Sequence, residues 1–292
     1  MNETPQSRPK RHETSVRPRS WAIMFVAVQR LWADEAVSLS GNIAFRTLWS
    51  AFPFLIFLTA LGGFVGDEDL ADALINFLFA VGPAEVMEPM ANEIHSIITT
   101  PRTDLLSIGF LITIWAAMAG VDSVRIGLNR AYNVRERRSS LKLYGLGVLF
   151  VIATAFVLLA LSVLIVVAPI IIAFIERYAP QMKDLVAVFS LVRYPVAVLL
   201  LTGALTAAHF LLPAKRLRLR QVLPGVILTV AAWVVLASAY SYYLANFATF
   251  ASFYAGLSGV FAALFFLYLA ALVLLLGGEV NRVVMLRKNA RR

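Results

Sequence analysis

The sequence predicts an all-α, polytopic membrane protein with six transmembrane helices and additional amphipathic interfacial helices. Of its 292 residues 60% are hydrophobic and only 15% are charged, and the mean hydropathy is +0.78. The longest stretch without Asp, Glu, Lys or Arg covers 58 positions, residues 221–278. One bilayer crossing needs roughly 20 apolar residues, so this stretch predicts two helices joined by an uncharged turn near residues 246–256.

The remaining segments follow from composition and helical periodicity. The polar, basic residues 1–20 predict a disordered cytoplasmic tail. Residues 21–34 predict an interfacial helix, because Trp21, Phe25, Val28 and Trp32 share one helical face. The six predicted spans, within a membrane domain of residues 35–286, are about 42–66, 104–124, 143–170, 190–213, 222–246 and 257–284. Residues 287–292 form a second basic cytoplasmic tail.

Two local features modify this plan. Pro53 lies inside the first span and lacks the N–H that a helix needs, so it predicts a kink there. The acidic segment 67–103 between the first two spans has apolar residues at helical spacing, which predicts outer amphipathic helices. This segment is large enough to dock a periplasmic or envelope partner.

The distribution of Lys and Arg predicts the orientation. If the predicted spans alternate, 22 of the 26 basic residues fall on one side, which the positive-inside rule assigns to the cytoplasm. Both termini are then cytoplasmic. This pattern also explains the net charge of +9 without a nucleic-acid partner, since juxtamembrane basic residues attract anionic lipids.

Ionisable and amide side chains near the membrane are the candidates for function, because each is costly there unless it is paired or hydrated. We predict a polar cavity on the cytoplasmic side built from Asn42, Arg46, Asp122, Arg125, Asn129 and Glu279. The alternative is structural. Asp122–Arg125 and Glu279–Arg282 would then be ion pairs at helix ends, and Arg46 would reach to the lipid headgroups.

Motifs for catalysis or for cofactor binding are missing from the sequence. It has no cysteine, and its three histidines (His12, His95 and His209) have no neighbouring ligand at metal-binding spacing. Nucleophile-elbow, Walker A and dinucleotide motifs are also missing. We therefore expect no enzyme activity, no metal and no cofactor.

Several motifs resemble one known family. Residues 40–53 (SGNIAFRTLWSAFP), residues 121–132 with the Leu-Asn-x-x-Tyr element, the proline–basic loop 212–225, and residues 254–260 and 276–281 (LGGEVN) occur in the expected order. They resemble the YihY/BrkB family of inner-membrane proteins over residues 32–284. The resemblance implies a six-helix inner-membrane fold. Some members have carried a transfer-RNA-processing ribonuclease label, but the sequence lacks the clustered ligands of metal-dependent hydrolysis.

The function that fits these observations best is transport. The chain would move an amphipathic or anionic solute, such as a lipid or an envelope precursor, with membrane lipids as its partners. Arg46 and Arg125 would contact a phosphate or carboxylate, while Asp122 and Glu279 would organise them or exchange protons. The alternative is an envelope structural or interaction protein without transport activity, docked through residues 67–103.

Overall fold

The computed structural model describes residues 20–65, 103–169, 171, 172, 175, 180–247 and 257–289. Every regular element within these residues is a helix, as the composition predicts. The expected disordered tail, nearly all of the expected outer segment 67–103, and the turn that follows the fifth span lie outside the described residues.

Most of the helices are long enough to cross a bilayer. Their bounds are α1 Ser20–Ala33, α2 Ala36–Val65, α5 Thr103–Ala131, α6 Ser140–Ser162, the π-helix η1 Val163–Val167, the 3-10 turn η2 Pro180–Met182, α8 Lys183–Leu211, α9 Leu219–Phe247 and α10 Leu257–Asn289. Five described segments have both the length and the apolar composition of a membrane span: Ile108–Ala131, Ser140–Ile165, Val186–Leu211, Leu219–Tyr243 and Gly259–Lys288. The 30-residue α2 contains most of the first predicted span but is not among these five, so the count of six remains a prediction.

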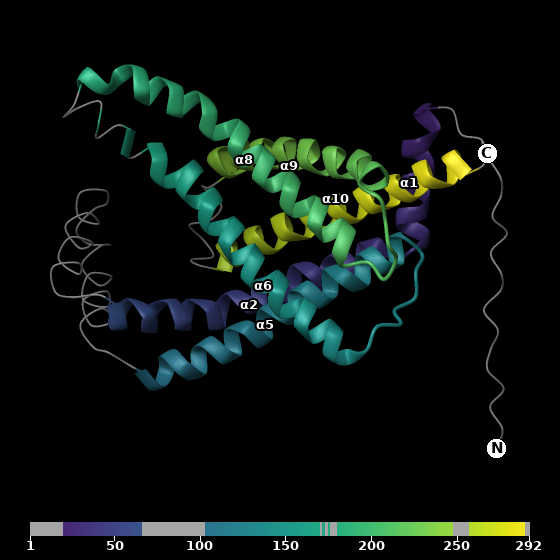
Figure 1. Ribbon diagram of the computed structural model, residues 1–292, viewed down its shortest axis with the longest axis horizontal. Coiled ribbons are helices and arrows are strands. Elements are labelled where there is room, and N and C mark those ends of the chain that lie inside the picture. Colours follow the sequence, from purple (N-terminus) through teal and green to yellow (C-terminus); the bar gives the residue numbers. More distant parts are fainter. Residues whose placement is uncertain are drawn as a thin grey trace.

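Helix α10 lies at the centre of the bundle and packs against α9, α2, α1 and α5 (Figure 1). Helix α2 pairs closely with α5, while α6 lies beside α5 and α8 lies beside α9. The outward side chains of α6, among them Phe156, Leu158 and Leu159, are exposed and apolar. Such a surface suits contact with lipid tails, because the helix already satisfies its own backbone polar groups.

The segments that connect α5 to α6 and α8 to α9 lie at the same end of the bundle as α1 and the end of α10 (Figure 1). The connection after α5 starts with a left-handed residue, Asn133, at φ 53°. The N–H of Val134 donates to the carbonyl of Asn129 at 2.9 Å, and that of Asn133 donates to Arg130 at 2.9 Å. This pair of bonds is a Schellman motif, and it turns the chain back toward α5.

Helices α9 and α10 cross with their backbones in contact. A Cβ added to Gly225 would collide with the carbonyl oxygen of Gly277, and one added to Gly277 would collide with the hydroxyl of Thr229. Small residues allow such close approach between membrane helices.

Prolines are accommodated inside the helices rather than at their ends. Pro53 lies within α2, which continues to Val65, so the predicted kink does not end this helix. After α6, the π-helix η1 carries a wider bond from the N–H of Ala168 to the carbonyl of Val163, just before Pro169. Because Pro169 has no N–H to donate, a widened turn here is a physical accommodation of the proline.

Candidate functional site

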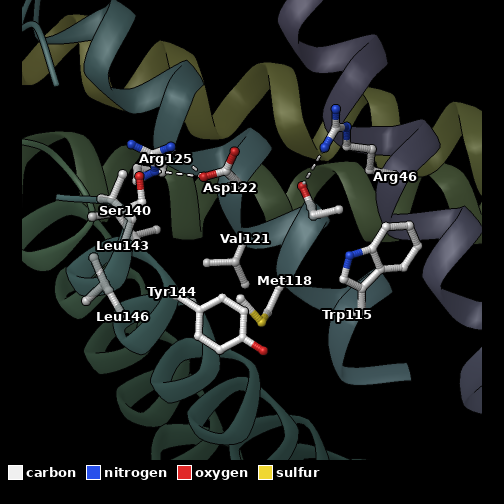
Figure 2. Close-up of a pocket in the computed structure, with 13 residues that line it drawn as sticks. Arg46, Trp115, Met118, Val121, Asp122, Arg125, Ser140, Leu143, Tyr144 and Leu146 are labelled. Carbon is white, nitrogen blue, oxygen red and sulfur yellow. Dashed lines mark hydrogen bonds and ion pairs between the residues drawn. The ribbon is translucent and has the colours of Figure 1, made fainter. Parts of the chain in front are cut away.

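A cleft of about 390 Å³ opens between α2, α5 and α6 (Figure 2). We call it the α5–α6 cleft. Its lining consists of Arg46, Trp115, Met118, Ala119, Val121, Asp122, Arg125, Ser140, Leu143, Tyr144, Leu146, Gly147 and Leu212. Apolar and aromatic side chains form one wall, and Trp115 and Tyr144 are 69% and 58% exposed. Three charged side chains lie on the other side, so the cleft is amphipathic.

Arg46 contributes a cation that forms no ion pair with any carboxylate of the described residues. It lies on α2 with an exposed side chain, and its Nη1 donates to the carbonyl oxygen of Ala119 at 3.5 Å (Figure 2). This long bond to a backbone oxygen is the one hydrogen bond that Arg46 makes to the described residues, and none of their carboxylates forms an ion pair with it. The guanidinium therefore retains donors for a ligand.

Arg125, by contrast, is held between two carboxylates. Its Nε donates to Oδ1 of Asp122 at 2.9 Å, and its Nη1 donates to Oε2 of Glu136 at 2.6 Å. The Arg125 side chain is 11% exposed, whereas that of Asp122 is 44% exposed. The predicted Asp122–Arg125 pair is present, and Arg125 positions the carboxylate of Asp122 at the edge of the cleft.

Glu136 is the acidic centre of the α5–α6 connection. Besides Arg125, it accepts hydrogen bonds from Nε of Arg138 at 2.9 Å, from the backbone N–H of Arg138 at 3.1 Å and from Nδ2 of Asn129 at 3.2 Å. The side-chain bond from Arg138 and the other donors hold the pKa of Glu136 well below its ordinary value, although burial acts in the opposite direction. Glu136 is not among the six residues predicted from the sequence. Its position as a single acid within a run of arginines, residues 135–138, is the signal that could have indicated it.

Arg138 connects this acidic centre to the end of α8. Its guanidinium donates to the carbonyl oxygens of Leu211 and Leu212, where α8 ends. Helix C-termini leave such carbonyls unpaired, and basic side chains commonly satisfy them. Asn129 adds a parallel link, because its Oδ1 accepts a bond of 2.7 Å from the backbone N–H of Ala214.

Three of the six predicted residues line the cleft, and the other three lie at separate positions. Arg46, Asp122 and Arg125 line the cleft. Asn129 lies behind it, bonded to Glu136, and Asn42 accepts a bond of 2.9 Å from the hydroxyl of Ser123 outside the lining.

Glu279 lies elsewhere, on α10, where its side chain is fully buried. No donor among the described residues bonds its two carboxylate oxygens. The sequence suggested an ion pair between Glu279 and Arg282. In the structure, Arg282 forms its ion pair with Asp34 instead, in the turn after α1, at 3.0 Å. Arg282 has this partner because the tertiary structure places the turn between α1 and α2, with the carboxylate of Asp34, beside α10.

A second polar cluster, which we call the buried joint, connects four helices. Its members are Tyr132, His209, Gly225 and Asn281. The hydroxyl of Tyr132 is 2.8 Å from Nδ1 of His209 and accepts a bond of 3.0 Å from Nδ2 of Asn281. Oδ1 of Asn281 in turn accepts a bond of 2.6 Å from the N–H of Gly225. The six residues predicted from the sequence include neither Tyr132 nor Asn281, although both belong to the motifs quoted above.

Long apolar helices around a cleft with charged and apolar walls define a multi-pass integral membrane protein. A sequence model of the family described as virulence factor BrkB matches residues 27–292. The chain therefore belongs to the BrkB family, in agreement with the resemblance found in the motifs.

Relatives carry names of two kinds. The chain is 28% identical over 259 residues to a ribonuclease-like protein, YfkH, of Bacillus subtilis, covering 89% of this chain and 94% of that protein. It is 22% identical over 271 residues to a UPF0761 membrane protein of Alteromonas mediterranea (91% and 88%) and 25% identical over 263 residues to one of Tolumonas auensis (86% and 81%). No solved structure matches the chain. Within the described part of the chain, no three His, Cys, Asp or Glu side chains are grouped as a metal site.

Proposed function

We propose that this protein moves an amphipathic or anionic solute, such as a lipid or an envelope precursor, across the bacterial inner membrane, and that the α5–α6 cleft binds it. The observation that carries the proposal is Arg46, an exposed guanidinium without a carboxylate partner among the described residues, at the edge of an apolar and aromatic wall. A planar guanidinium binds phosphate or carboxylate through paired hydrogen bonds. The wall beside it suits the apolar part of the same molecule.

The two arginines of the cleft have different roles in this proposal. Arg46 contacts the anionic group of the solute directly. Arg125 already bonds Asp122 and Glu136, so it positions Asp122 rather than binding the anion. The volume of about 390 Å³ is near the lower end of the usual range for small-molecule sites. It suits a headgroup and the first part of the chains, and the rest of a lipid would extend into the bilayer.

Transport is tested with purified protein in liposomes that contain acyl-labelled lipids and an impermeant quencher outside. We expect Arg46→Ala to lower the rate of lipid movement about 10- to 100-fold, because charge-assisted hydrogen bonds contribute about 1.5–3 kcal/mol. Arg46→Lys should retain part of the rate. The matched control is Arg130→Ala, which removes an arginine from α5 that pairs with Glu35 outside the cleft lining.

The outcomes separate this proposal from its alternative. Equal rates with wild-type protein and with empty liposomes would reject transport. Stoichiometric binding of an envelope protein without lipid movement would favour the structural alternative.

The proposed orientation places both termini and the α5–α6 connection in the cytoplasm. The chain has no native cysteine, so single cysteines at Ser96, Ser139 and Asn289 can be introduced without background. An impermeant thiol reagent added to intact spheroplasts should label only the Ser96→Cys variant. Labelling of Ser139→Cys in sealed cells would reverse the orientation.

A further inference from the structure

The lining of the α5–α6 cleft contains charges of both signs. Its lining has two cations, Arg46 and Arg125, and one carboxylate, Asp122. Glu136, directly behind Arg125, supplies a second carboxylate. Glu136 is also bonded to Arg138, so the cleft keeps separated charges of both signs, and Arg46 is a cation without a carboxylate partner among the described residues. A ligand that carries both signs fits this arrangement.

Asp122 provides the acceptor for a cation. Its Oδ1 takes both hydrogen bonds from Arg125, while its Oδ2 accepts none from the described residues. The side chain is 44% exposed and lines the cleft. Because Arg125 restrains the carboxylate through Oδ1, Oδ2 is held in place at the edge of the cleft (Figure 2).

The spacing of the two charges follows from the helix. Arg46 reaches the carbonyl oxygen of Ala119, and Asp122 lies three residues further along α5. Residues three apart share one face of a helix, with an axial rise of about 4.5 Å. The carbonyl that Arg46 reaches and the backbone of Asp122 therefore lie less than one helical turn apart along α5. A phosphate and an ammonium joined by two carbons form a ligand of matching size.

Resting on the proposed function, we propose that the cleft selects lipids with an ethanolamine-phosphate headgroup, with the phosphate on Arg46 and the primary ammonium on Asp122. A primary ammonium has three N–H donors and makes a charge-assisted hydrogen bond to Oδ2. A choline headgroup has no N–H to donate, and a glycerol headgroup has hydroxyl donors but no positive charge. The apolar wall of Trp115, Met118 and Tyr144 takes the start of the acyl chains.

The experiment compares the movement of acyl-labelled phosphatidylethanolamine, phosphatidylglycerol and phosphatidylcholine in otherwise identical liposomes. We expect wild-type protein to move phosphatidylethanolamine about 10-fold faster than either of the others, as one additional charge-assisted bond implies. In Asp122→Asn this ratio should fall to about 1. Asp122→Glu, which keeps the carboxylate, should retain part of the preference.

The possible results are distinguishable. If wild-type protein moves all three lipids at one rate, or prefers phosphatidylcholine or phosphatidylglycerol, the headgroup proposal is wrong while transport stands. If no lipid moves, the proposed function itself fails. The wild-type comparison does not depend on a variant that folds, and an unchanged preference in a folded Asp122→Asn protein would also overturn the assignment to Asp122.

Discussion

The α5–α6 cleft and the buried joint contain polar groups of opposite character. In the joint, neutral side chains and a backbone N–H bond one another across four helices, and His209 and Asn281 are fully buried. In the cleft, the side chains of Arg46 and Asp122 are exposed, and Arg46 and one oxygen of Asp122 lack strong partners among the described residues. Mutually bonded buried groups stabilise a fold, whereas exposed and incompletely bonded charges remain available to a ligand. The difference suggests that the two polar regions serve packing and binding respectively.

The largest loss of stability is expected from Gly225→Ala, within the buried joint. The new Cβ would collide with the backbone carbonyl of Gly277, which cannot move without separating α9 from α10. We expect a cost of about 3 kcal/mol or more in the free energy of unfolding. Denaturation of the purified protein in detergent measures it. Gly203→Ala is the control, since its Cβ would meet nothing within 4 Å, and a loss of similar size there would contradict the explanation.

A somewhat smaller loss is expected from Asn281→Ala. This change leaves the buried N–H of Gly225 without its acceptor and removes a donor from Tyr132. An unsatisfied buried group costs about 1–3 kcal/mol, so we expect about 2–3 kcal/mol by the same measurement. Asn42→Ala, which removes one bond at an exposed position, should cost less than about 1 kcal/mol. Equal losses for the two variants would erase the distinction between joint and surface.

Two neighbouring acids at the start of α2 test the importance of burial. Asp34 pairs with Arg282, and the two side chains are 15% and 13% exposed. Glu35 pairs with Arg130, and these side chains are 70% and 39% exposed. We expect Asp34→Asn to cost about 2 kcal/mol, since a mostly buried arginine loses its partner, and Glu35→Gln to cost less than about 1 kcal/mol. The reverse order would show that burial does not decide the value of these pairs.

Glu136 should make the stability of the protein depend on pH. Its pKa is lowered in the folded state from an ordinary value of 4.5, so the unfolded state binds more protons when the medium becomes acidic. The stabilisation is complete above this value and is lost as the pH falls below it. We expect the melting temperature of wild-type protein to fall more steeply below about pH 5 than that of Glu136→Gln. Parallel profiles would contradict the assigned role.

The smallest effect on stability is expected where the effect on function is largest. Arg46 is exposed and makes one long bond to a backbone oxygen, so Arg46→Ala should change the free energy of unfolding by less than about 0.5 kcal/mol. Its lipid movement should nevertheless fall. A loss of stability comparable to that of Asn281→Ala would instead make Arg46 a structural residue. The cleft and the buried joint would then no longer differ in the role of their polar groups.

The sequence by itself determined the features that depend on local spacing and on composition. Apolar stretches of spanning length predicted the helices, because a bilayer core requires a helix to satisfy its own backbone polar groups. The pairing of Asp122 with Arg125 also followed from the sequence, since residues three apart share a helical face.

Only the tertiary structure decided which distant groups meet. Arg282 pairs with Asp34 rather than with Glu279, because the turn after α1 brings a second carboxylate to α10. Glu136 reaches Arg125 because the Schellman motif at Asn133 folds the connection back onto α5. Helical periodicity does not predict these contacts, because the partners are far apart in the sequence or because the contact depends on one residue in the left-handed conformation. Glu279 lies outside the cleft lining for the same reason, because the sequence does not show which helices its side chain faces.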